Sequence, residues 1–212
     1  QVVVGVDIGK SVNSTVISAW SVEKSEKGNT ARLAYIEEIN PRSGGHDIPY
    51  QRHRIMEVAT QMKADKLIID ATGIGGAIEQ DLRVACISTS PQIHFIPFVF
   101  TGGPKGSKTQ AYRDYVSYIQ QGIVKIPHPD NLDKNDAKLI NKWIREHCEL
   151  EYVMDAAQKT ERIAAPDGKH DDYCDSSVMG IHACLSMSPA SATFASADMS
   201  GNTRRNSVNN TI

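Results

Sequence analysis

The sequence lacks the features of several protein classes. No apolar run approaches the roughly 18 residues that cross a bilayer, and the mean hydropathy is −0.35. There is no excess of charge of either sign, because 23 Lys and Arg stand against 25 Asp and Glu, for a formal charge of −2. These absences predict no membrane-spanning helix and no membrane partner, and they exclude a strongly basic protein that coats nucleic acid.

Cysteine is scarce, with 4 residues in a chain of 212. Their spacings match no zinc motif, which predicts reduced thiols in a reducing compartment; they are Cys86, Cys148, Cys174 and Cys184. The chain opens on Gln1 and a Val-rich segment, without an initiator Met or a signal-peptide pattern. This start is expected of a segment cut at a domain boundary.

The first forty residues predict an antiparallel meander of three strands. The strands are expected at Val2–Ile8, Thr15–Trp20 and Arg32–Ile39, separated by short polar or Gly-containing stretches. The first is almost continuously apolar, which is typical of a central strand buried on both faces.

The rest of the chain alternates strands with helices. Strands are expected at Lys66–Asp70 and Ile93–Phe100, and Pro97 favours an edge or bulged position for the second. Helices are expected near Tyr50–Lys63, after the turn at Thr72–Gly76, and over Thr109–Gln121, Asp136–Cys148 and Asp171–Met187, with a β-hairpin over Leu150–Met154 and Thr160–Ala164. The pattern predicts an α/β fold in which helices flank a mixed sheet. Residues 1–187 are expected to form one domain, and residues 188–212, poor in large apolar side chains, a flexible tail.

Acidic residues stand where the apolar segments end. Asp7 ends the first strand, Asp70 ends the KLIID strand, and Asp171 and Asp172 open the last helix, with Asp175 one turn later. An acid at the end of a buried strand is costly unless it is paired or bound to metal, and ligand sites in open α/β sheets lie at the carboxyl ends of strands. Each acid alone also fits a turn or a helix cap. Together they predict a bound cation, since Mg²⁺ is held by a few carboxylates; Asp171, three residues before Cys174, is expected on the core-facing line of the helix.

Basic residues near these acids are candidates for contacts with a phosphate backbone. Lys105 and Lys108 lie in a Gly-rich stretch that also fits an ordinary solvated loop. Lys169 and His170 directly precede the acidic pair, and His170 fits a turn residue equally well. We therefore regard these four residues as candidate DNA contacts on position and charge.

Three motifs carry the acids: GVDIGKSVNSTVI around Asp7, IIDATGIGGAI around Asp70, and PDGKHDDYCDS around Asp171 and Asp172. They resemble the motifs of the C-terminal nuclease domain of the large terminase subunit of tailed bacteriophages, over about residues 2–187. The resemblance implies a ribonuclease H-like fold and a metal-dependent endonuclease that cuts concatemeric double-stranded DNA. It implies that two Mg²⁺ or Mn²⁺ ions act in a two-metal mechanism, with these catalytic and metal-binding residues: Asp7, Asp70, Asp171 and Asp172.

The resemblance also implies partners, and one motif of the packaging ATPase is absent from this sequence. The partners would be double-stranded DNA, the terminase ATPase domain, the small terminase subunit and the portal protein, in the host cytoplasm. No Walker-type G-x-x-x-x-G-K-[ST] motif occurs, so we expect these residues to cut DNA but not to translocate it. Ser176 follows Asp175 where an Ala is usual.

Other functions stay open on the same residues. Asp7-Ile8-Gly9 also fits an actin-like sugar kinase or ATPase, which ATP-dependent stabilisation would reveal. A non-catalytic portal-binding scaffold would use the acids only as caps and would bind no Mn²⁺ through them. A Holliday-junction-resolvase-like nuclease would prefer branched to linear DNA.

Overall fold

A six-stranded mixed sheet forms the centre of the computed structural model, which describes residues 1–9, 13–25, 28–41, 47–71, 76–100, 108–155 and 160–185. The strand order is β5-β4-β1-β2-β3-β6. The strands are β1 Val2–Asp7, β2 Thr15–Ser25, β3 Gly28–Ile39, β4 Lys66–Asp70, β5 His94–Phe98 and β6 Val124–Lys125. Strand β2 is antiparallel to both β1 and β3, whereas β4 is parallel to β1, β5 to β4 and β6 to β3. The meander followed by βα units is thus confirmed, and Pro97 lies on an edge strand.

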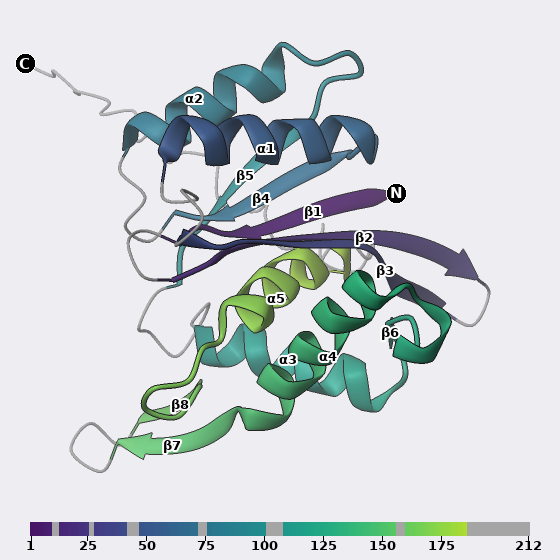
Figure 1. The fold of residues 1–212 in the computed structure, drawn as a ribbon, viewed down its shortest axis with the longest axis vertical. Helices are drawn as coiled ribbons and strands as arrows, with labels where there is room; N and C mark the ends of the chain where they lie inside the picture. Colours follow the sequence, from purple (N-terminus) through teal and green to yellow (C-terminus); the bar gives the residue numbers. More distant parts are fainter. Residues whose placement is uncertain are drawn as a thin grey trace, which may run out of the picture.

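Helices cover both faces of this sheet (Figure 1). On one face lie α1 Ile48–Gln61 and α2 Gly76–Ile87; on the other lie α3 Lys108–Gln120, α4 Lys134–Glu149 and α5 Asp172–Leu185. A 3-10 turn, η2 Pro129–Asn131, precedes α4, and the strands β7 Glu151–Asp155 and β8 Thr160–Ala164 form the separate hairpin. The fold class is therefore the one that the sequence predicts, an α/β fold with an added hairpin. The expected tail lies outside the described residues.

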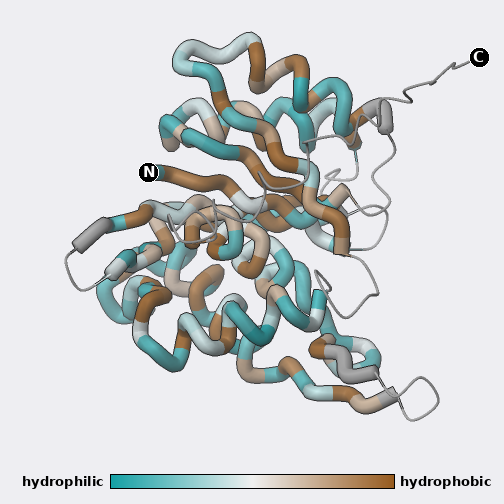
Figure 2. Tube along the Cα trace, turned by 180° about the vertical axis from the view of Figure 1, so that it is seen from behind, coloured by the Kyte–Doolittle hydropathy of each residue, from teal (hydrophilic) through white to brown (hydrophobic). Residues whose placement is uncertain are grey.

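Side-chain alternation along the strands divides the core into two clusters. Val3 of β1 packs with α3, α4 and α5, whereas Val4 and Val6 pack with α1 and α2. This is the two-sided burial expected of a central strand in a covered sheet. Figure 2 shows the same feature as hydrophobic tube segments running through the middle of the molecule.

The helix α5 is buried all round, which its one-sided apolar stripe does not predict. It is covered by the sheet on one side and by α3 and α4 on the other. A Cβ on Gly5 would collide with the carbonyl oxygen of Ser176, so the backbones of β1 and α5 are in contact. The hydroxyl of Ser176 donates to the carbonyl of Gly5 at 3.0 Å and also bonds Ser18 on β2 at 2.7 Å. The start of α5 is therefore held firmly against β1.

The predictions about the cysteines and about membrane-spanning helices can be compared with the structure. All four cysteines, which lie within the described ranges, are free thiols rather than disulfide partners. Across the described part of the chain, no helix combines the length and apolar character needed to span a bilayer.

Candidate active site

Asp7 and Asp70 lie on the face of the sheet that α5 covers. By alternation Asp7 shares the face of Gly5, against which α5 packs, and Asp70 shares the face of Ile68 in the same core cluster. Because β1 and β4 are parallel neighbours, their carboxyl ends meet at one edge. The helix α5 begins with Asp172 at this edge, so the three acidic motifs come together.

The electrostatics of Asp7 show how close the acids are. Desolvation raises the pKa of Asp7 well above its ordinary value. The negative charges of Asp175, Asp172 and Asp70 raise this pKa further, while the charge of Lys108 lowers it. Asp7 is therefore the acid on which the charges of all three motifs act.

Both carboxylate oxygens of Asp175 are hydrogen-bonded. The hydroxyl of Tyr112 donates to Oδ1 at 2.5 Å, and the ammonium of Lys108 donates to Oδ2 at 2.5 Å. The same ammonium donates to Oδ2 of Asp171 at 3.0 Å. Burial raises the pKa of Asp175 to about 6, although Lys108 acts to lower it. Burial also lowers the pKa of Lys108, but Asp175 and Asp171 raise it by more, so the ammonium stays charged.

The position of Asp171 differs from its expected place on the core-facing line. Asp171 precedes α5, and its side chain is 26% exposed. The acids that point inward are Asp172 and Asp175, which are 6% and 7% exposed. Asp171 directly precedes the helix, and its carbonyl oxygen accepts a hydrogen bond from the N–H of Asp175 at 2.8 Å.

Asp172 faces a small polar cavity of about 180 Å³. Its carboxylate lies 3.8 Å from Nδ1 of His170. Burial raises the pKa of Asp172, and the nearby His170 lowers it. The cavity is lined by Ser14, Glu38, Asn40, Pro41, Lys142, His170 and Asp172.

Glu38 on β3 orders one wall of this cavity. Its Oε1 accepts hydrogen bonds from Ser14 at 2.6 Å and from Lys142 at 2.5 Å, and its Oε2 accepts one from the hydroxyl of Tyr173 at 3.0 Å. Burial acts to raise the pKa of Glu38, but these bonds, led by that of Lys142, lower it overall. The sequence analysis did not identify Glu38. The pattern that could have identified it is side-chain alternation, which places Glu38 on the same covered face of β3 as Ile36.

Glu146 on α4 is a second acid that the sequence interpretation missed. It is 3% exposed, and its Oε2 accepts the backbone N–H of Tyr173, in the first turn of α5, at 3.0 Å. Among the described residues, its Oε1 is the one buried side-chain nitrogen or oxygen without a hydrogen-bond partner. Burial raises the pKa of Glu146 to about 7. The available signal is its place three residues after Trp143, on the apolar face of α4.

Comparison with known proteins identifies the fold. No family model and no curated protein matches the chain. The nuclease domain of the large terminase subunit gp2 of bacterial virus Sf6 matches with a TM-score of 0.59 and 12% identity, over 85% of this chain and 87% of that one. A mutant of that domain with manganese and beta-thujaplicinol matches with a TM-score of 0.61, 12% identity and the same coverage. The fold is ribonuclease H-like.

A weaker match is the Holliday junction resolvase of fowlpox virus. Its TM-score is 0.47 at 17% identity, over 88% of this chain and 100% of that one. The identities to the Sf6 domain are low, so that likeness is one of fold.

The predicted DNA contacts lie in different surroundings within the ribonuclease H-like fold. Lys108 points into the acidic cluster, and His170 lines the polar cavity. Lys169 lies on the surface and pairs with Glu149 at 2.9 Å. Lys105 lies outside the described residues. Their contact with DNA therefore stays a prediction.

The donor set of this site fits a hard divalent ion. Among the described residues, no three or more His, Cys, Asp or Glu side chains converge closely enough to hold a metal as they stand. The acids nevertheless meet at one sheet edge, and their mutual repulsion contributes to the raised pKa of Asp7. A divalent cation relieves such repulsion, and carboxylate oxygens are the ligands that Mg²⁺ and Mn²⁺ prefer. The carboxylates that would hold it are those of Asp7, Asp70 and Asp172.

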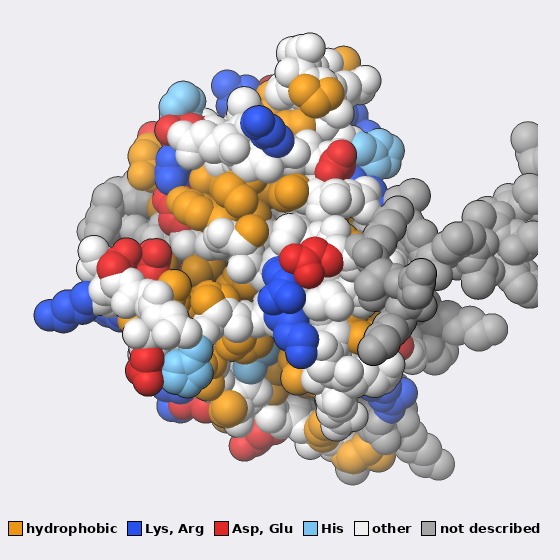
Figure 3. Space-filling model, turned by 90° about the vertical axis from the view of Figure 1, so that its right-hand side faces the viewer, with side chains coloured by type: hydrophobic (Ala, Val, Ile, Leu, Met, Phe, Trp, Pro, Cys, Tyr) orange, Lys and Arg blue, Asp and Glu red, His pale blue; other side chains and the backbone are white. Residues whose placement is uncertain are grey.

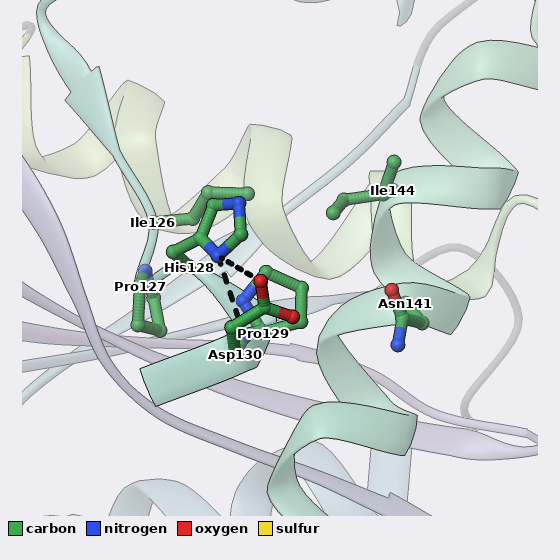
Figure 4. A pocket seen from close by; sticks show the side chains of 7 residues that line it. All are labelled: Ile126, Pro127, His128, Pro129, Asp130, Asn141 and Ile144. Carbon is green, nitrogen blue, oxygen red and sulfur yellow. Dashed lines mark hydrogen bonds and ion pairs between the residues drawn. The ribbon is translucent and has the colours of Figure 1, made fainter. Parts of the chain in front are cut away.

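A larger cavity, of about 450 Å³, lies apart from these acids (Figure 4). Ile126 to Asp130 form one side of it, and Asn141 and Ile144 of α4 form the other. On the first of these sides, Nδ1 of His128 lies 3.6 Å from Oδ2 of Asp130. This cavity contains none of the candidate site residues.

Proposed function

We propose that this chain is a divalent-metal-dependent endonuclease that hydrolyses phosphodiester bonds of double-stranded DNA. The observation that carries the proposal is the meeting of Asp7, Asp70 and Asp172 at one edge of a ribonuclease H-like sheet. Structural carboxylates serving only as caps would not need to share one edge, where the negative charges of Asp172 and Asp70 raise the pKa of Asp7.

The carboxylates of this site would hold Mg²⁺ or Mn²⁺, and the motif resemblance implies two ions. The bound metal supplies Lewis-acid chemistry, which activates water and stabilises negative charge on the leaving oxygen. Asp7 lies near both Asp70 and Asp172, so it would be the ligand that the two ions share. Lys142 places positive charge beside Asp172, and the His170 ring lines the same cavity, where a phosphate oxygen can bind. Glu38 fixes the direction of the Lys142 ammonium.

The biological role that we propose is the cutting of concatemeric viral DNA during genome packaging. The three acidic motifs and the likeness in fold to the Sf6 terminase nuclease domain support it. The partners would then be the terminase ATPase domain, the small terminase subunit and the portal protein, in the host cytoplasm. Lys105, Lys169 and His170 would contact the DNA backbone.

Plasmid cleavage in Mn²⁺ tests this function. We expect Asp7→Asn and Asp70→Asn each to reduce cleavage at least about 100-fold, because each removes a ligand charge from the metal site. Asp130→Asn, which removes an acid outside the cluster, should cut normally. Circular dichroism would verify that each variant is folded. Undiminished cutting by Asp7→Asn would overturn the proposal, and a strong preference for four-way junctions over linear duplex would replace the packaging role with a resolvase role.

A further inference from the structure

The outward face of α4 carries a stripe of basic and polar side chains. Its members are all exposed and follow one another three or four residues apart, which places them on one face of the helix: Lys134, Lys138, Asn141 and Arg145. The one acid within this stretch, Asp136, is two residues from Lys138 and so lies on the other side of the helix. At 1.5 Å of rise per residue, the stripe is about 16 Å long.

The cations of the α4 stripe are not neutralised by the chain's own acids. Lys142, on the flank of the same helix, pairs with Glu38. Within the residues that the structure describes, Lys134, Lys138 and Arg145 form no such ion pair. Positive charge left uncompensated on one helix face attracts an anionic partner.

The cavity of about 450 Å³ lies directly beside the α4 stripe (Figure 4). Asn141 belongs to both, and Ile144, three residues further along the helix, lines the cavity opposite Ile126. Both isoleucines pack against the core, so their positions are fixed from beneath. The stripe of cations therefore borders a groove with apolar side chains on both of its sides, which suits an apolar group.

The far rim of the groove distinguishes between two kinds of anion. Asp130 lies on that rim with its side chain 87% exposed, and Asp133 caps the start of α4 nearby. A nucleic acid strand that crossed the groove would bring its continuous negative charge against Asp130. A peptide can instead place acids on the stripe and an uncharged residue beside Asp130. The arrangement therefore favours an acidic peptide over a nucleic acid.

We propose that the α4 stripe and the adjoining groove form a docking site for an acidic segment of a partner protein, which inserts one apolar side chain between Ile126 and Ile144. The acids of this segment pair with Lys134, Lys138 and Arg145, and the length of the stripe matches about five residues of extended chain. The site contains none of the proposed metal ligands. It therefore goes beyond the proposed nuclease function and does not depend on it.

Fluorescence anisotropy with a synthetic peptide tests this site. The probe is a fluorescein-labelled peptide in which a Leu-Phe pair stands between two runs of glutamate, and EDTA is present so that no metal contributes. We expect the parent chain to bind this peptide with a Kd below about 1 mM. Replacing Leu-Phe by Ser-Ser should weaken binding at least about tenfold, because the groove then buries no apolar side chain. Runs of lysine in place of glutamate should abolish it.

Variants of the chain separate this site from general charge attraction. Lys138→Glu combined with Arg145→Glu should weaken binding of the Leu-Phe peptide at least about tenfold, because two attractions become repulsions. Asn141→Trp fills the groove from an exposed position and should weaken binding as well. The matched control is Arg52→Glu combined with Lys63→Glu, which makes the same change of charge at exposed positions in and just after α1, on the other face of the sheet. The control should bind the peptide normally, and circular dichroism would verify that each variant is folded.

Four results would overturn the inference. They are no binding of the Leu-Phe peptide at 1 mM, equal binding of the Leu-Phe and Ser-Ser peptides, equal binding by the parent chain and the α4 double variant, and an equal loss in the control. A short DNA duplex that binds in EDTA through Lys138 and Arg145, when the peptide does not, would also overturn it and make this face a nucleic acid contact. None of these results depends on whether the chain cuts DNA in Mn²⁺, so failure here and failure of the proposed function are distinguishable.

Discussion

The Asp7 carboxylate lies among three other acids, and this placement opposes folding when no metal is bound. Its pKa is raised by desolvation and by its acidic neighbours, so ionised Asp7 is held at an unfavourable site. Active sites commonly carry this conflict, in which a group needed for function lowers stability. This loss of stability can be measured with a substitution that removes the charge of Asp7 but keeps the shape of its side chain.

We expect Asp7→Asn to stabilise the metal-free protein at pH 7. The gain should be about 1 kcal/mol, or roughly 2–4 °C in the melting temperature of a chain of this size. The variant should also lose the stabilisation that Mn²⁺ gives the parent chain. Thermal unfolding followed by circular dichroism, with EDTA or with MnCl₂, measures both effects.

The control for this prediction is Asp130→Asn, which changes an exposed acid of η2. It should leave both the melting temperature and its response to Mn²⁺ unchanged. A lower melting temperature for Asp7→Asn in EDTA would contradict the electrostatic account, because it would mean that ionised Asp7 is well satisfied without metal.

Glu146 predicts a pH dependence of stability near neutrality. Its pKa is about 7 in the folded chain, against an ordinary value of 4.5. The folded state therefore binds more protons than the unfolded state between these values, so the contribution of Glu146 is fully present below pH 4.5 and is lost as the pH rises through 7. We expect Glu146→Gln to remove this loss and to be more stable than the parent at pH 8 by about 2 kcal/mol. Urea unfolding at pH 5 and pH 8 gives the two free energies.

A glutamine at position 146 keeps an oxygen for the N–H of Tyr173, so the start of α5 stays capped. The matched control is Glu149→Gln, which changes a glutamate of the same helix that pairs with Lys169 at the surface. If Glu149→Gln also removed the loss of stability between pH 5 and pH 8, Glu146 would not be the source of that loss.

At the level of elements, the contact between β1 and α5 sets the geometry of the site. A Cβ on Gly5 would collide with the carbonyl oxygen of Ser176 and would lie 2.8 Å from the Gly180 nitrogen. Both are backbone atoms, so they cannot rotate away as a side chain would. The contact holds the first turn of α5, with Asp172 and Asp175, beside the end of β1.

We expect Gly5→Ala to lower the free energy of unfolding by about 3 kcal/mol or more, because α5 must move off the sheet. The movement should also weaken Mn²⁺ binding, since it separates the acids of α5 from Asp7. Gly168→Ala is the control: a Cβ there meets nothing within 4 Å, and φ is +77°, so only the backbone cost of about 1 kcal/mol is expected. Equal losses in the two variants, by urea unfolding, would contradict the close contact of strand and helix.

For the whole molecule, the sequence predicts the order of elements better than the contacts between them. Apolar runs and Gly-Pro punctuation locate the strands because burial on both faces demands them. The ends of β1 and β4 also locate Asp7 and Asp70. The pairing of Lys108 with Asp175 depends on α3 lying beside α5, and no local pattern contains that packing. The same holds for Ser176, whose hydroxyl donates to the carbonyl of Gly5 on another element.

The whole-molecule balance of charge predicts how DNA would be held. The formal charge is −2, and Figure 3 shows basic, acidic and hydrophobic side chains interspersed on one face of the molecule. If the metal site and a few basic side chains such as those of Lys169 and His170 make the contacts, about three or four phosphates are neutralised. Each contributes roughly 0.9 to the slope of log K against log salt, so we expect a slope of about −3.

Fluorescence anisotropy with a short duplex in CaCl₂, over a series of KCl concentrations, measures this slope. Ca²⁺ is suitable because it is a hard cation that carboxylates bind. Binding should weaken strongly in EDTA, because the unscreened acids of Asp7, Asp70 and Asp172 then repel the phosphates. Lys169→Met should reduce the slope by about 1, whereas Lys138→Met should not change it. A slope near −8, or equal affinity in EDTA, would require an extended basic surface. The prediction that DNA is bound only through the metal site and a few basic side chains would then be wrong.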